Sequence, residues 1–112
     1  MAVRASSNNP QQLLNEIKAA IRAGTVQTWL LDQDGDLTHS PTQWKNKAWF
    51  RPSVELGTLV FKILAQQSVP MTTEVYAVYH GRLIEMLLAH FDQKFTSAVA
   101  TAQAIVGEYI GT

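Results

Sequence analysis

The chain has 112 residues, with nine Lys and Arg, nine Asp and Glu, and no Cys. Its formal net charge of zero disfavours binding to nucleic acid or to an anionic membrane through an excess of cations. The absence of cysteine excludes disulfides, thiolate metal ligands and cysteine nucleophiles. No apolar run approaches the roughly 20 residues of a bilayer span, and the polar start lacks the apolar segment of a signal peptide. We therefore expect a cytoplasmic protein without membrane contact.

Local capping signals predict the first helix. Residues 1–9 are polar and predict a disordered lead-in, so a single folded domain is expected to span residues 10–112. Asn9 suits a helix N-cap, and Pro10 suits the first helical position. The apolar side of this helix is marked by Leu14, Ile17 and Ile21. These signals together predict a helix over residues 10–23.

Short strands are expected after this helix. Residues 25–32 are rich in β-branched and large apolar side chains, which favour a strand. Asp34-Gly35 follows and is a strong signal for a hairpin turn, with residues 36–39 as the returning strand. A single helical turn is expected around Trp44, and residues 48–51 are expected to be extended because Arg51 precedes a proline.

Residues 54–65 carry two competing patterns. Their apolar positions fit a helix, but they also alternate as in a strand, and Gly57 argues against a helix start. We expect a strand here. A final strand is predicted over residues 94–102, where β-branched and aromatic residues recur. The last residues, 105–112, contain two glycines and are expected either to fray or to cover a sheet edge.

Residues 72–91 have the clearest long helical pattern, with apolar residues at spacings of three and four. Gly81 costs about 1 kcal/mol in a helix interior, so the alternative is a strand and a shorter helix that meet there. We expect one continuous helix. The predicted fold class is therefore α+β, a small antiparallel sheet of three to four strands with two helices, 10–23 and 72–91, packed on one face.

The segment from Trp29 to Thr38 resembles the first motif of the haloacid-dehalogenase-like phosphatases, an apolar strand followed by Asp-x-Asp-Gly-Thr-Leu. The resemblance implies a nucleophile at Asp32 and a general acid and base at Asp34, with magnesium beside them. Asp36 stands where that family has Thr, and Asp92 is the only later Asp. The match covers about ten residues, and the remainder of that family's site is missing.

Asp32, Asp34 and Asp36 can also be compared with a calcium-binding loop, because they would occupy its first, third and fifth positions. Leu37 stands where that loop needs Gly, and Gln43 stands where it needs Glu. These acids are therefore only weak metal candidates. The prediction is a hairpin turn flanked by solvated carboxylates, with no metal site.

The densest polar and aromatic group lies on the second predicted helix. It consists of Tyr76, Tyr79, His80, Arg82 and Glu85. Arg82 and Glu85 are three residues apart and can pair on a helix surface. Arg82 is expected on the apolar side, where a charge needs either a partner, such as a bound anion, or a path for its head into water. This group is the first place where we expect a ligand site.

A second candidate group interleaves aromatic and cationic residues between Trp44 and Arg51. Its main members are Trp44, Trp49 and Arg51. Stacking platforms within a basic groove bind single-stranded nucleic acid. The same tryptophans could instead anchor an irregular segment to the core.

No complete catalytic, metal or nucleotide motif is present, and the three histidines lack the paired spacing of zinc ligands. The sequence thus predicts a small binding or interaction protein without catalytic activity or cofactor. A protein partner or self-association is expected, with a homodimer as one form of it. The first alternative is a ligand-binding domain or enzyme that uses His80, Arg82 and Glu85. The second is a single-stranded nucleic-acid binder that uses residues 44–51.

Overall fold

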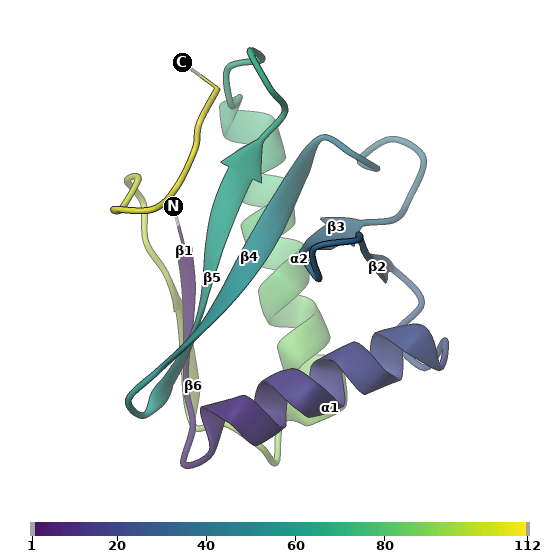
Figure 1. The fold of residues 1–112 in the computed structure, drawn as a ribbon, viewed down its shortest axis with the longest axis vertical. Helices are drawn as coiled ribbons and strands as arrows, with labels where there is room; N and C mark the ends of the chain where they lie inside the picture. Colours follow the sequence, from purple (N-terminus) through teal and green to yellow (C-terminus); the bar gives the residue numbers. More distant parts are fainter. Residues whose placement is uncertain (1, 112) are drawn as a thin grey trace.

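The structure is a computed structural model that describes residues 2–111. It contains six strands and two helices (Figure 1). In chain order these are β1 (Ala2–Ser6), α1 (Pro10–Arg22), β2 (Trp29–Leu31), β3 (Leu37–His39), β4 (Ala48–Glu55), β5 (Thr58–Ala65), α2 (Thr73–Phe91) and β6 (Ser97–Ala100). They form one α+β domain. Among the described residues, no helix is both long and apolar enough to cross a membrane.

The six strands form a single antiparallel sheet in the order β2-β3-β4-β5-β1-β6. The prediction of three to four strands is therefore wrong. Eight-residue strands β4 and β5 form the longest ladder, and Gly57 joins them with a positive φ of 70°. The range 54–65 is thus divided. Its larger part is a strand, as predicted, but Val54 and Glu55 end the preceding strand.

Strand β1 corrects the expected disordered lead-in, of which only Met1 lies outside the described residues. Residues 2–6 pair with β5 on one side and with β6 on the other, so β1 lies inside the sheet. Val3 and Ala5 are fully buried, while Arg4 between them is partly exposed. Five alternating residues are too short a pattern to stand out in the sequence. The strand forms because two distant strands satisfy its backbone groups.

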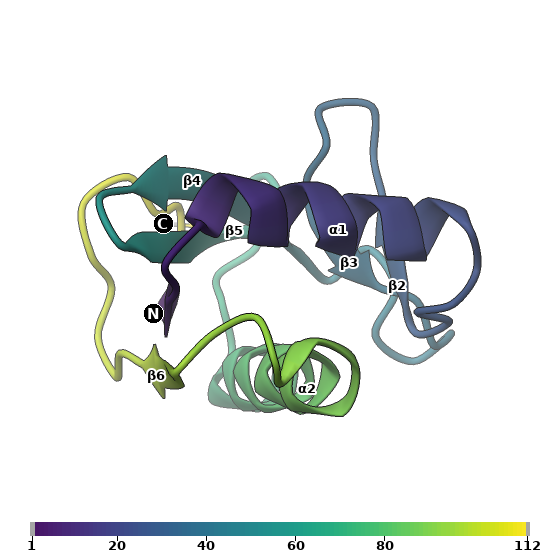
Figure 2. The ribbon, with the colours of Figure 1, turned by 90° about the horizontal axis from the view of Figure 1, so that it is seen from below.

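Both helices agree with the predictions. The Asn9 side chain accepts a hydrogen bond from the backbone N–H of Gln12 at 3.0 Å, which caps α1. The Thr72 hydroxyl accepts one from the N–H of Val75 and caps α2. Helix α2 continues through Gly81 without a break. In Figure 2, α1 crosses the view lengthwise above α2, which is seen nearly end-on, and β4, β5 and β6 lie to one side of the two helices.

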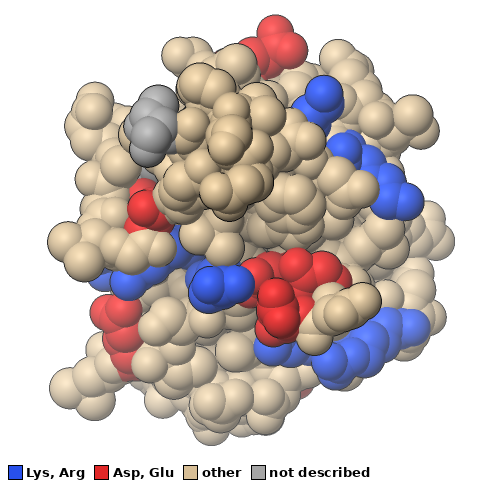
Figure 3. Space-filling view, turned by 45° about the horizontal axis from the view of Figure 1, so that its top comes forward, with Lys and Arg blue, Asp and Glu red and all other residues tan. Residues whose placement is uncertain are grey.

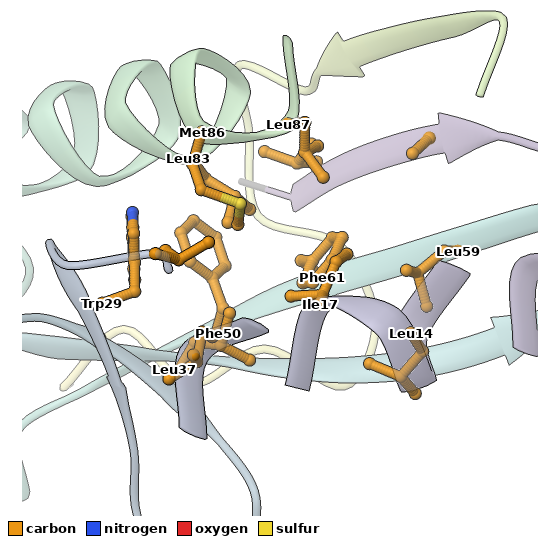
Figure 4. Close-up of a cluster of buried hydrophobic side chains, with 14 of the residues drawn as sticks. Leu14, Ile17, Trp29, Leu37, Phe50, Leu59, Phe61, Leu83, Met86 and Leu87 are labelled. Carbon is orange, nitrogen blue, oxygen red and sulfur yellow. The ribbon is translucent and has the colours of Figure 1, made fainter. Parts of the chain in front are cut away.

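The helices and the sheet share one hydrophobic core (Figure 4). Phe50 of β4 lies at its centre, because its ring contacts the rings of Trp29, Phe61, Tyr79 and His80. Helix α1 contributes Leu13, Leu14, Ile17 and Ile21, and α2 contributes Tyr79, Leu83, Met86, Leu87 and Phe91. The core therefore holds together elements from both ends of the chain.

The C-terminal segment covers part of a sheet edge, one of the two outcomes expected for it. The described pairing between β1 and β5 reaches Lys62, and beyond that point the C-terminal segment lies beside β5. Tyr109 fills this position and forms a parallel bridge with Leu64. The N–H of Ala65 donates to the Tyr109 carbonyl at 2.7 Å, and the N–H of Ile63 donates to the Glu108 carboxylate at 2.7 Å. Thr112 lies outside the described residues.

Candidate functional site

The structure places two members of the predicted ligand-binding group in the core. Tyr79 is fully buried, its hydroxyl lies 3.1 Å from the Thr38 hydroxyl, and it donates to the Trp44 carbonyl. His80 is buried, with its Nδ1 at 2.7 Å from the Tyr76 carbonyl. The hydroxyl of Tyr76 itself donates to the carbonyl of Thr101, just beyond β6. These side chains fasten α2 to both ends of the sheet.

Arg82 and Glu85 lie together on the exposed surface of α2. Their side chains form an ion pair at 3.2 Å, and each is more than half exposed. The predicted pairing is confirmed, but the placement of Arg82 on the apolar side of the helix is wrong. An exposed pair at this spacing contributes only about 0.2–0.5 kcal/mol. The predicted group is therefore divided between the protein interior and the surface, and it does not converge on a common cavity.

The aromatic and basic residues between Trp44 and Arg51 are also divided. Trp44 lies in the turn before β4 and lines a cleft with Lys47. Trp49 and Arg51 project from β4 and line a shallow depression beside Asp32 and Asp34. Figure 3 shows acidic side chains directly beside the basic ones on the face that it draws. The two tryptophans thus do not form one platform within a basic groove.

The carboxylates of Asp32 and Asp36 accept hydrogen bonds from within the protein. The Asp32 carboxylate accepts hydrogen bonds from the N–H groups of Asp34 and Asp36, both at 2.9 Å. The buried Asp36 carboxylate accepts two hydrogen bonds from Arg51, at 2.8 and 3.2 Å, which raises the pKa of that guanidinium above its usual range. Oxygen atoms of the three acids lie within 4.8 Å of one another. Gly35 has a φ of 82°, so the predicted hairpin turn is confirmed, but the expectation of solvated carboxylates is wrong for Asp36, which is buried.

His39 is a buried histidine in an aromatic setting. Its ring centre lies 4.8 Å from that of Trp29 and 6.0 Å from that of Tyr79. Its Nδ1 lies 2.8 Å from the Thr28 carbonyl, which can only accept, so the neutral ring carries its proton on Nδ1. Burial lowers the pKa of His39, and the nearby Arg82 lowers it further, against opposing contributions from the Thr28 hydrogen bond and from Glu85.

We expect the stability of the fold to decrease at acidic pH partly through His39. Because its pKa is lower in the folded than in the unfolded state, the unfolded chain binds more protons as the pH falls below about 6.5. The stabilisation is complete above that value and is lost as the pH falls toward the folded pKa. Thermal unfolding at several pH values should show a smaller decrease in Tm for His39→Asn, whose amide can replace the Nδ1–H donor. An identical pH dependence in both proteins would contradict this prediction.

Strand β6 presents an unpaired edge. β1 pairs with one side of it, and within residues 2–111 no strand pairs with the other. The side chains of β6 are Ser, Ala, Val and Ala, and Val99 is 57% exposed. Proteins usually protect such edges with charges, prolines or bulges. Charges and prolines are both missing here, since the sequence contains no charged residue or proline from Phe95 to Gly107.

An apolar strip of α2 flanks this edge. The row Tyr76, His80, Ile84 and Leu88 follows the i+4 spacing of a helix surface. Tyr76 donates to the carbonyl of Thr101 just beyond β6, so the row starts beside the end of β6. The exposure of its side chains increases along the helix: His80 is buried, Ile84 is partly buried, and Leu88 is 56% exposed. Gly81 and Ala77 are exposed beside it. We call the free edge of β6, with Ala77, Gly81, Ile84 and Leu88, the association surface.

This surface could not be recognised from the sequence alone. The uncharged run after Phe95 was a visible signal, but its meaning depends on which strand β6 pairs with. Only the placement of β1 between β5 and β6 makes β6 the last strand of the sheet. A comparison with protein families, with curated proteins and with solved structures finds no match to this chain.

Proposed function

We propose that this chain is a small interaction protein without catalytic activity that works as a homodimer joined through the association surface. The observation that carries the proposal is the uncharged, unpaired edge of β6 beside an apolar strip of α2. Two such edges would pair in antiparallel fashion about a two-fold axis, and one sheet would then continue through both copies. The proposal keeps the cytoplasmic location expected from the sequence.

Self-complementarity favours a second copy as the occupant of this edge. In a two-fold interface the same patch of each subunit forms both sides of the contact, so the patch must be complementary to itself. The free N–H and C=O groups of one β6 supply the acceptors and donors that the other needs. The patch as defined contains no charged side chain, and Arg82 and Glu85 on the neighbouring surface of α2 form an ion pair with each other. The small side chains of β6 also allow two copies to come close.

Gly81 supports the same arrangement. A Cβ built at this position would meet nothing within 4 Å, so the packing of a single copy does not require glycine there. Glycine nevertheless costs about 1 kcal/mol in a helix interior. Beside Ala77 and Leu88 it leaves a shallow gap on the surface of α2, into which a side chain of a second copy can pack. The cost in helix stability is then offset at the interface.

Sedimentation of the purified protein over a range of concentrations tests the proposal. We expect a mass of about twice 12.4 kDa for the wild type. Val99→Lys places a charge on the edge strand and should give a monomer that keeps its circular dichroism spectrum. Leu88→Glu tests the helical part of the surface in the same way. Val54→Lys is the matched control, because Val54 is a similarly exposed valine at the end of β4.

The proposal is wrong if the wild type remains a monomer at the highest concentration. It is also wrong if Val99→Lys and Leu88→Glu both sediment as dimers, or if Val54→Lys dissociates the dimer as fully as they do. In the last case the association would depend on surface charge rather than on the β6 edge.

A further inference from the structure

A cleft of about 310 Å³ lies between the turn before β4, the end of β5 and the first turn of α2. Its apolar lining includes Trp44, Val69, Met71 and Val75. Its polar lining includes Gln43, Lys47, Gln66 and Glu74. This volume is at the lower end of the range for small-molecule sites. None of the lining residues belongs to the association surface, so the inference below does not depend on the proposed dimer.

The Trp44 wall of the cleft is fixed by hydrogen bonds. The backbone N–H of Trp44 donates to the Pro41 carbonyl at 2.8 Å. The backbone carbonyl of Trp44 accepts from the hydroxyl of the buried Tyr79. The side chain of Trp44 packs against the hydrophobic core while remaining partly exposed. An aromatic surface that is already in place costs little conformational entropy when a ligand packs on it.

The opposite wall is fixed by the C-terminal segment. The N–H of Met71 donates to the carbonyl of Ile110 at 2.8 Å. Ala65, at the end of β5, is held by its hydrogen bond to Tyr109. Met71 and Val75 also pack against the core. The two apolar walls are therefore joined to separate parts of the fold, and the cleft does not depend on one flexible loop.

Four polar side chains around the cleft are available for a ligand. Among residues 2–111, the side chains of Gln43, Lys47, Gln66 and Glu74 make no hydrogen bond or ion pair with one another or with any other residue. One ammonium group and one carboxylate thus border the same apolar surface without neutralising each other. A ligand with both charges could use each of them.

We infer that this cleft binds a small zwitterion, an α-amino acid with an aromatic or large aliphatic side chain. The carboxylate of the ligand pairs with Lys47, and its ammonium group pairs with Glu74. The side chain packs on Trp44, whose ring also attracts a neighbouring cation. The amides of Gln43 and Gln66 can donate to and accept from the polar end of the ligand. No bond is made or broken, so the site is one of binding only.

Titration with L-phenylalanine, followed by NMR at the indole N–H of Trp44, tests the inference. The indoles of Trp29 and Trp49 serve as internal references, since neither lines the cleft. We expect a saturable shift at Trp44 alone. 3-Phenylpropanoate lacks the ammonium group and phenethylamine lacks the carboxylate, so each should bind several-fold more weakly. Lys47→Gln and Glu74→Gln should each weaken phenylalanine binding about threefold to fivefold. Lys45→Gln, an exposed neighbour outside the cleft, should not change it.

Three results would overturn the inference. The first is no saturable shift at Trp44 with any of the three compounds up to roughly tens of millimolar. The second is equal binding of phenylalanine and its two singly charged analogues, which would show that the site recognises only the ring. The third is equal weakening by Lys45→Gln and Lys47→Gln, which would show an effect of net charge. The Gln variants change only exposed side chains, so their folding is not in question.

Discussion

Val3→Asp is expected to destabilise the protein by about 4 kcal/mol or more, enough to unfold much of a domain whose total stability is about 5–15 kcal/mol. The Val3 side chain is fully buried, and it lies on a strand that pairs with β5 and β6 at the same time. A carboxylate there would have no partner in the core. Urea unfolding followed by circular dichroism measures the loss of free energy.

Arg4→Gln provides the matched control for this substitution. Arg4 is the next residue of β1, points away from the core, and lies 3.9 Å from Glu55 with both side chains more than 40% exposed. Removing such a pair should cost less than about 1 kcal/mol. If Val3→Asp were as well tolerated as Arg4→Gln, residues 2–6 would not form a strand within the sheet, and β6 would lose the strand with which it pairs.

Gly111→Ala is expected to cost about 3 kcal/mol or more. Gly111 has a φ of 84°, a conformation in which a side chain is strained. A Cβ at this position would lie 1.8 Å from the Val69 carbonyl oxygen and 2.9 Å from the Pro70 Cα. These are backbone atoms and cannot move aside as a side-chain tip could. The C-terminal segment would have to separate from residues 69–71, and the free energy of unfolding measures that cost.

Gly57→Ala is the control that distinguishes the strain of the backbone conformation from the steric clash expected in Gly111→Ala. Gly57 has a similar φ of 70°, but nothing lies within 4 Å of a Cβ built there. The free energy of unfolding of this variant should decrease by only about 1–2 kcal/mol, which is the cost of the left-handed conformation for a residue with a side chain. Equal losses at Gly57 and Gly111 would mean that the contact between Gly111 and Val69 does not restrain the C-terminal segment.

The helices and the tight turn could be predicted because their determinants are local. Asn9 caps α1 through an N–H three residues away, and Thr72 does the same for α2. The turn at Asp34-Gly35 is closed by Asp32, whose carboxylate binds the N–H groups two and four residues on. Such contacts lie within a few residues of one another, so a short stretch of sequence contains all the groups that make them.

The sheet order and the candidate sites were decided by tertiary structure. A strand must find its partners elsewhere in the chain, and β1 finds them near residues 58–62 and 97–100. The same long-range pairing makes β6 an edge. The pairing of β4 with β5 places Trp49 on the sheet, whereas Trp44 stays in the preceding turn, although only five positions divide them. The sequence by itself determined where the helices begin and which turn closes the first hairpin. Which surfaces remain open was settled only by the burial of one continuous core, because burial depends on every element at once.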